Sequence, residues 1–542
     1  MVACVSGHVA DIANLVCLPW LGHTPCCGAR RKVTHVVIIG AGGGGLAAAA
    51  QLARAGLDVT VLEAHIYAGG SAGTFFHQGY RFDAGATLAG GFAPGAPLDW
   101  IGKQFEIDWQ VKLAERAMQV HLPDGVQVTR WTDVERWQEE RQAAFGHAVE
   151  DFWLWQESTA DLLWDFALRS PNWPPQNWKD LAGLSRVSLG WLLNSHGARG
   201  SSFVPGMLKD AITPLSSRLP HNPHLRQFVD GQLLIAAQAT SESANALYSS
   251  AALDLSRQGV GHIEGGMGAL ADKLVEAVRR YGGEVRFRQE VDAVKRMANG
   301  LYEVATRQGK NYRADQVIFN LPPANIVELL GEGTPKGFQK KQTIPADGWG
   351  AFMVYAGVDE DFLPDDTALH HQVLVEEPFA EGNSVFLSLG PSWDQKRAPS
   401  GKRALTISTH TNLDEWWHLF EYDRRAYEQL KSEYTQRLLS AAEAALPGIG
   451  KAAELVLPGT PVTFQRFTRR QRGWVGGFPQ THLLRAWGPR ISKDLWMVGD
   501  SIFPGQSFPA VALGGVRVAN SLLAELNRSV VFRESPLEQA SI

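Results

Sequence analysis

The stretch Thr34-His35-Val36-Val37-Ile38-Ile39-Gly40-Ala41-Gly42-Gly43-Gly44-Gly45 decides the fold of this 542-residue chain. Its apolar half is rich in β-branched residues and predicts a buried strand. Its glycines fit G-x-G-x-x-G, and an alanine-rich helix is expected from Leu46 to about Ala55. Gly56 follows where a glycine commonly ends a helix, and residues 58–62 predict a second strand. The order strand, glycine turn, helix, strand is that of a dinucleotide-binding unit.

Each glycine of the turn has a physical role in such a unit. Gly40 allows the tight turn, and Gly42 lets the backbone approach a pyrophosphate. Gly45 lets the helix pack close to the sheet. The helix N-terminus, with its free N–H groups and partial positive charge, is expected to face the phosphates. Glu63 ends the second strand, about 20 residues after the glycines, where an acid accepts hydrogen bonds from a ribose.

A membrane helix is the main alternative for this segment, because residues 36–53 carry no charge. Five of the six residues 40–45 are glycines, which form helices poorly, and a strand that begins with Asp58 follows. We therefore prefer the dinucleotide site.

Composition limits the class of protein. The net charge is −5 without a long basic run, so nucleic-acid binding is not expected. The length requires at least two domains. All four cysteines precede Arg30, so no disulfide holds the rest of the chain, and their spacing matches no usual zinc site. No metal is predicted, and residues 1–33 are expected to be a poorly ordered extension.

Tryptophan is the most unusual feature of the composition. Ten of the 18 tryptophans fall between Trp100 and Trp191. This segment is interpreted as a surface for an apolar ligand, a bilayer, or both, with core packing as the alternative.

The nucleotide-binding signals recur in three separate blocks. Residues 34–91, 259–323 and 491–526 are therefore assigned to one cofactor-binding domain of α/β class. Residues 92–258 and 324–490 are assigned to an interleaved mixed α/β substrate-binding domain, and residues 527–542 to a C-terminal tail. Helices are expected at 145–168 and 414–446, strands at 350–355 and 384–389, and a hairpin turn at Asn299-Gly300.

An ordered set of motifs then resembles a known family. The set comprises Gly69-Gly70-Ser71-Ala72-Gly73, Phe82-Asp83-Ala84-Gly85-Ala86-Thr87, His262-Ile263-Glu264-Gly265-Gly266-Met267 and Gly499-Asp500-Ser501-Ile502-Phe503-Pro504-Gly505-Gln506. It is similar to the carotenoid desaturase and isomerase family of FAD enzymes, over about residues 33–526. The chain looks closest to the carotenoid 3,4-desaturases, whereas its ending 503–506 is closer to the isomerase branch. The resemblance implies a Rossmann-like, amine-oxidase-like FAD domain.

The resemblance also implies FAD contacts at the matching positions. The expected set is Gly40, Gly42, Gly43, Gly45, Glu63, Gly70, Ser71, Val291, Gly499 and Asp500. Of these, Gly40, Gly42 and Gly45 are expected to face the pyrophosphate. Many relatives have an arginine where this chain has Ser71, so one charge partner of the cofactor is missing.

Several polar residues have two readings. Asp83 either orients a turn or belongs to the flavin site. His262 and Glu264 are either catalytic or structural beside Gly265-Gly266. His221 and His224 lie in a Pro/Asn loop and are read as surface histidines. No catalytic residue is therefore assigned.

The family implies 3,4-desaturation of an acyclic, 1-hydroxylated carotenoid in a tunnel lined by Trp and Phe. Oxygen or a quinone is the expected electron acceptor, and the expected location is the cytoplasmic side, in peripheral contact with a membrane. A carotene cis–trans isomerase and a phytoene desaturase are the alternatives within the family. Outside it, an isoprenoid-binding escort protein without flavin and an amine oxidase are carried as alternatives.

Overall fold

The computed structural model describes residues 33–528 except 172, 177, 179, 183–208, 340–347, 479, 484 and 485. Residues 34–542 form one unit, separate from residues 1–33. The four cysteines, the predicted extension to residue 32 and the predicted tail beyond residue 528 lie outside the described residues.

A five-stranded parallel sheet forms the nucleotide-binding half of the fold. Its strand order is β19 (Leu495–Met497), β13 (Gln316–Phe319), β1 (His35–Ile39), β2 (Asp58–Leu62) and β9 (Glu284–Arg286). These strands come from the three blocks singled out in the sequence, and the predicted Rossmann-like fold class is confirmed. The domain boundaries themselves stay predictions.

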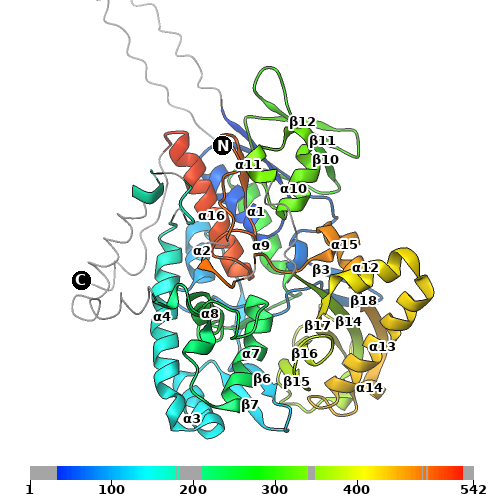
Figure 1. Cartoon of the computed structure of the whole chain (residues 1–542). Helices are drawn as coiled ribbons and strands as arrows, with labels where there is room; N and C mark the ends of the chain where they lie inside the picture. The colour runs from blue at the N-terminus through cyan, green and yellow to red at the C-terminus, as the bar shows by residue number, and fades with distance from the viewer. Residues whose placement is uncertain are drawn as a thin grey trace, which may run out of the picture. The chain divides into compact units, whose positions relative to one another are not determined.

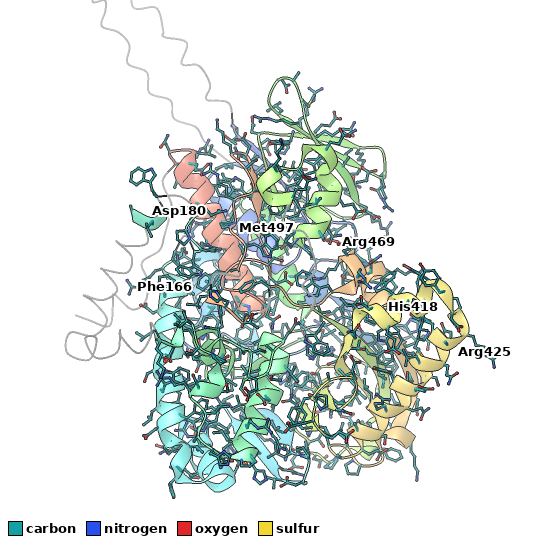
Figure 2. The ribbon with its side chains drawn as sticks, in the orientation of Figure 1. Phe166, Asp180, His418, Arg425, Arg469 and Met497 are labelled. Carbon is teal, nitrogen blue, oxygen red and sulfur yellow. The ribbon has the colours of Figure 1, made fainter. Side chains whose placement is uncertain are left out.

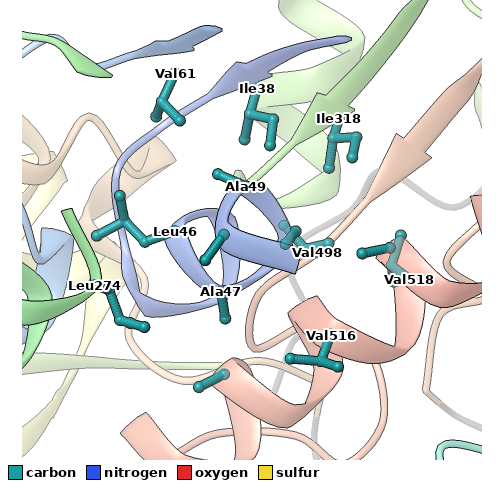
Figure 3. Close-up of a cluster of buried hydrophobic side chains, with 14 of the residues drawn as sticks. Ile38, Leu46, Ala47, Ala49, Val61, Leu274, Ile318, Val498, Val516 and Val518 are labelled. Atoms are coloured by element: carbon teal, nitrogen blue, oxygen red, sulfur yellow. The ribbon is translucent and has the colours of Figure 1, made fainter. Parts of the chain in front are cut away.

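Helix α1 (Gly43–Arg54) lies between this sheet and helix α16 (Phe508–Glu525). Figure 3 shows Ala47 and Ala49 of α1 between the strand side chains and Val516 of α16. Alanine and glycine have short side chains, so the two helices approach closely: a Cβ on Gly515 would lie 2.1 Å from the carbonyl oxygen of Gly44. Helix α9 (Gly268–Arg280) also packs against α1.

Helix α1 begins three residues earlier than the sequence predicted. Gly43, Gly44 and Gly45 are helical, although glycine disfavours helices. The reason is steric: a Cβ on Gly45 would lie 2.4 Å from the Gly40 oxygen, and one on Gly44 would lie 3.1 Å from Gly499 N. Close packing around the first turn of α1 therefore outweighs the low helix propensity of glycine.

A seven-stranded mixed sheet forms the other half (Figure 1). All of its pairings are antiparallel except β15 with β6. Its order is β18 (Ala453–Gly459), β14 (Trp349–Asp359), β17 (Lys402–Asn412), β16 (Ser384–Leu389), β15 (His370–Leu374), β6 (Arg116–His121) and β7 (Gln127–Trp131). Both predicted insertions contribute strands to it.

The remaining strands form small sheets. They are the hairpin β3 (Thr74–His77) and β4 (Tyr80–Asp83), the pair β5 (Val111–Leu113) and β8 (Gly261–Ile263), and the meander β10 (Val291–Arg296), β11 (Tyr302–Thr306) and β12 (Asn311–Ala314). The turn between β10 and β11 contains Asn299 and Gly300, as predicted, and Gly300 has a φ of 83°.

Eleven further α-helices are present in the described residues. They are α2 (Pro97–Phe105), α3 (Val134–Phe145), α4 (Glu150–Leu168), α7 (Pro223–Ala237), α8 (Ala246–Ala252), α10 (Pro323–Leu330), α11 (Lys336–Gln339), α12 (Leu413–Tyr422), α13 (Arg424–Ala442), α14 (Ile449–Ala452) and α15 (Pro461–Thr468). Within the described part of the chain, no helix combines the length and apolarity needed to cross a membrane.

Two predicted helices differ from the structure. The helix expected at 145–168 begins later, at Glu150 of α4, because Gly146, whose φ is 79°, ends α3 at Phe145. The helix expected at 414–446 is broken at Asp423, whose side chain accepts a hydrogen bond from Ala426 N and starts α13. In both cases a residue at a helix end changes the bounds of the predicted helix.

Candidate functional site

A cavity of about 720 Å³ runs from the glycine turn to the seven-stranded sheet. Segments from all three cofactor blocks and from both insertions line it. Nine of the ten residues predicted to bind FAD are on its wall: Gly40, Gly42, Gly43, Glu63, Gly70, Ser71, Val291, Gly499 and Asp500. Gly45 is not on this wall, and its expected contact with the pyrophosphate stays a prediction. Gly45 packs against Gly40, and Gly44 takes its place on the wall.

The two glycine motifs meet at one end of the cavity. Gly42 and Gly69 form an isolated parallel bridge, and Gly69 N donates to Ala41 O at 2.9 Å. The first N–H groups of a helix have no partner within the helix, so Gly43 and Gly44 present donors to the cavity. This arrangement suits the oxygens of a pyrophosphate.

Glu63 holds the turn as well as facing the cavity. Its two carboxylate oxygens accept from Ala41 N at 2.7 Å and from His65 N at 2.8 Å. Burial raises the pKa of Glu63, and the N–H groups of His65, Ala41 and Ala64 oppose that rise. Each oxygen keeps a free lone pair, so hydrogen bonds from a ribose remain available.

Asn320 is a wall residue for which sequence reasoning predicted no role. It follows β13, the neighbour of β1, and its Nδ2 donates to Gly40 O at 3.3 Å. A Cβ on Gly42 would lie 2.7 Å from that same amide nitrogen. The signal in the sequence was a polar residue directly after a buried strand, at the edge where parallel strands end together.

Positive charge reaches the cavity from a segment that the sequence analysis did not select. Arg466, Arg469 and Arg470 line the wall, within α15 and directly after it (Figure 2 labels Arg469). Arg470 pairs with Asp500 at 2.9 Å, and Arg469 pairs with Glu290 at 3.2 Å. These arginines supply cations that Ser71 cannot.

The residues with two readings lie away from the cavity lining. Asp83 is buried; it accepts from Thr74 Oγ1 at 2.6 Å and Met267 N at 2.9 Å, and it pairs with Arg397 at 3.0 Å. Glu264 pairs with Lys396 at 2.7 Å, near the surface. These contacts support the structural readings.

The contacts of the histidines also support structural roles for them. His262 stacks on His370 with centroids 5.1 Å apart, and burial lowers its pKa to about 4. His224 pairs with Asp124 at the surface, as predicted.

The far end of the cavity is an uncharged chamber. Helix α7, its C-cap and the seven-stranded sheet contribute Ile235, Ala236, Gln238, Ala351, Met353, Ser384, Phe386, Ser408, Thr409 and His410 to the lining. None of these residues is acidic or permanently charged. Burial lowers the pKa of His410 to about 4, so its imidazole is neutral at neutral pH.

The predicted tryptophan lining is wrong for the described residues. No described tryptophan lines this cavity, whereas Phe386, Phe464, Phe467 and Phe508 do. Trp137 and Trp153 pack against each other in the core at 5.3 Å, and Arg130 lies over the Trp137 ring. Core packing therefore explains these tryptophans.

The residues present fit FAD. Two glycine turns leave room for backbone contact, helix N–H groups face the cavity, Glu63 stands at the ribose position, and arginines line the wall, two of them in ion pairs with Glu290 and Asp500. An uncharged chamber then continues from the cofactor cradle, where a substrate can lie beside the cofactor.

Comparison with known proteins agrees with this geometry. Residues 44–448 match the family model of flavin-containing amine oxidoreductases. The chain belongs to this family. It is an FAD-dependent oxidoreductase with the amine-oxidase-like fold that was predicted.

The relatives and solved structures cover nearly the whole chain. The chain is 28% identical to the chloroplastic prolycopene isomerase of Arabidopsis thaliana, over 90% of this chain and 82% of the relative. It is 24% identical to the neurosporene-forming phytoene desaturase of Cereibacter sphaeroides, over 91% and 95%. The structure of putrescine oxidase bound to putrescine covers 92% of this chain and 99% of its own, with a TM-score of 0.58 and 15% identity, and shows the fold alone.

Proposed function

We propose that this protein is an FAD-dependent carotenoid 3,4-desaturase that acts on the end of an acyclic, 1-hydroxylated carotenoid. The observation that carries the proposal is a cofactor cradle continuous with an uncharged chamber. A hydrocarbon needs few polar anchors, because burial of apolar surface contributes about 25 cal/mol per Å². Relatives named for reactions on carotenoids support the same substrate class.

When bound, FAD supplies the two-electron acceptor for removal of hydride from carbon. The residues of the chain bind the cofactor and orient the substrate. Glu63 and Asn320 hold the glycine turn, and the Arg470–Asp500 pair fixes the wall beside Gly499. Met353 and Phe386 offer an apolar surface that aligns a polyene. We propose oxygen or a quinone as the terminal acceptor, and peripheral contact with a membrane as the source of the substrate.

Expression in cells that accumulate the hydroxylated acyclic carotenoid tests the proposal. Pigments are separated by chromatography and measured by mass and absorption. A product that has lost two hydrogens and absorbs at longer wavelength is expected. The Gly42→Val variant is the control, because its side chain would fill the cofactor cradle beside Asn320. Unchanged pigments with a well-expressed, FAD-containing protein would contradict the proposal.

Carotene cis–trans isomerisation is the second candidate. The similarity to prolycopene isomerases from Arabidopsis thaliana and Daucus carota favours it, as does the motif Phe503-Pro504-Gly505-Gln506. Isomerisation leaves the mass unchanged and requires previously reduced FAD. Prolycopene supplied to the protein under reducing conditions, followed by mass analysis, separates the two reactions.

Phytoene desaturation would differ from the first candidate only in substrate and in the number of steps. Two alternatives of other classes have less support. An amine oxidase would have to bind a cationic substrate, but the chamber end of the cavity offers no carboxylate within its described lining. An isoprenoid escort protein without flavin would not need Glu63, the glycine turns and Gly499 together on one wall.

A further inference from the structure

A row of polar side chains crosses the buried face of the seven-stranded sheet. Tyr355, Thr406, Ser388 and His370 are successive cross-strand partners on β14, β17, β16 and β15. All four are buried, at 7%, 3%, 7% and 2% exposure. Apolar residues would be expected at such positions, because burying polar groups costs free energy unless they are hydrogen-bonded.

Part of this row connects to the cavity wall. The Ser388 hydroxyl donates to Thr87 Oγ1 at 2.6 Å, and His370 Nδ1 lies 2.9 Å from Ser388 Oγ. Thr87 lines the cavity, on the segment that leads from Asp83 into the chamber. A continuous series of hydrogen bonds therefore runs from the cavity to a buried imidazole.

The series ends at a nitrogen without a partner. His370 Nε2 is buried and makes no hydrogen bond among the described residues. The ring stacks on His262 and, with centroids 5.9 Å apart, on Phe386. Burial, and then the charges of His262, His371 and Arg397, lower the pKa of His370 well below its ordinary value. The imidazole is therefore neutral at rest.

The hydrogen bonds of Thr87, Ser388 and His370 do more than anchor the cavity-lining segment 84–87 to the sheet. Tyr355 already ties the segment to the sheet, because its hydroxyl donates to Ala84 O at 2.6 Å. A serine–threonine pair would add a second anchor without any histidine. The buried imidazole, with one nitrogen in the series and the other unpartnered, suits a group that takes up a proton.

We propose that Thr87, Ser388 and His370 form a proton relay that takes up the proton released when the substrate is desaturated. The proposal rests on the proposed desaturase function. One carbon loses hydride, with two electrons, to FAD. The C–H bond on the adjoining carbon then breaks, and its electron pair becomes the second bond of the new C=C.

The proton from that C–H bond passes to Thr87 Oγ1, the Thr87 proton passes to Ser388 Oγ, and the Ser388 proton passes to His370 Nδ1. In the structure Ser388 donates to Thr87, so both hydroxyls rotate and reverse this bond before the proton moves. The series then runs toward His370 when Nε2 carries the resting hydrogen. A proton next to a delocalised carbocation is strongly acidic, so a weakly basic imidazole is a sufficient acceptor.

Paired variants of Thr87 test the relay in the FAD-loaded protein. Thr87→Val keeps the shape of the side chain but removes its hydroxyl, whereas Thr87→Ser keeps the hydroxyl. We expect Thr87→Val to lower kcat about 10²-fold with little change in KM, and Thr87→Ser to retain most of the activity. The solvent isotope effect in D₂O should be present in the wild type and absent in Thr87→Val. Thr406→Val, a cross-strand neighbour of Ser388 outside the series, is the matched control.

A second measurement is independent of turnover. In FAD-loaded protein labelled with ¹⁵N-histidine, the His370 resonances should report hydrogen on Nε2, and Ser388→Ala should shift the Nδ1 resonance. Equal kcat in Thr87→Val and Thr87→Ser, or an Nδ1 resonance that Ser388→Ala leaves in place, would overturn the relay alone. A wild-type product of unchanged mass would overturn the desaturase function and the relay together.

Discussion

At the scale of the residue, the cofactor cradle depends on two polar side chains at the ends of neighbouring strands. Glu63 follows β2 and Asn320 follows β13, and both strands pair with β1. Glu63 could be predicted, because an acid at that distance from a glycine turn is a known pattern. Asn320 could not be assigned, because only the pairing of β13 with β1 brings it beside Gly40.

Asn320→Asp should weaken FAD binding at least about tenfold, or about 1.4 kcal/mol. The amide N–H that donates to Gly40 O would be replaced by a carboxylate oxygen, which repels that carbonyl and adds negative charge beside the pyrophosphate position. Fluorescence titration of the apoprotein with FAD measures the dissociation constant. Asn299→Asp, in the exposed β10–β11 turn, should bind FAD as the wild type does. If the two variants bound FAD with equal affinity, Asn320 would not contribute to FAD binding.

His410 should make stability depend on pH. Its folded pKa of about 4 lies below the unfolded value of about 6.5, so its stabilising contribution is complete above the unfolded value and is lost as the pH falls toward 4. The loss for this one residue is at most about 3 kcal/mol. His410→Phe should therefore lose less stability than the wild type between about pH 7 and about pH 5 in urea unfolding. Parallel losses in both proteins would contradict a half-buried, neutral His410.

At the scale of the element, local sequence signals predicted strands and turns well and helix ends less well. The β10–β11 turn needs a positive φ at Gly300, a requirement that glycine satisfies locally. The start of α1 was misplaced, because glycine disfavours helices in isolation and only the contacts with Gly499 and α16 require it there. The break at Asp423 was missed, because apolar periodicity continues across it.

The contact between α1 and α16 should not tolerate a methyl group. In Gly515→Ala the new Cβ would lie 2.1 Å from Gly44 O, so the helices must separate or shift. Overpacking of this kind costs about 1–3 kcal/mol, and the expected result is a lower Tm with weaker FAD retention. Gly333→Ala is the control, because no atom lies within 4 Å of its Cβ position. Two variants with the Tm of the wild type would contradict this packing.

At the scale of the whole molecule, the site is assembled from residues that are distant in the chain. Thr87 and Ser388 are 301 positions apart, and Arg470 reaches the cavity from the end of α15. Nine wall residues could be predicted from sequence motifs, because each motif fixes its geometry through residues that are near in the chain. The chamber could not be predicted, because its wall is a sheet face formed by several strands, and the abundant tryptophans pack mainly in the core.

The central claim is that bound FAD accepts electrons from a polyene inside this cavity. The most direct measurement is an anaerobic single turnover, in which FAD-loaded protein is mixed with the 1-hydroxylated acyclic carotenoid while flavin absorbance and product mass are recorded. We expect loss of the oxidised-flavin absorbance in a one-to-one ratio with a product lacking two hydrogens. Flavin that stays oxidised, with substrate recovered at unchanged mass, would contradict it.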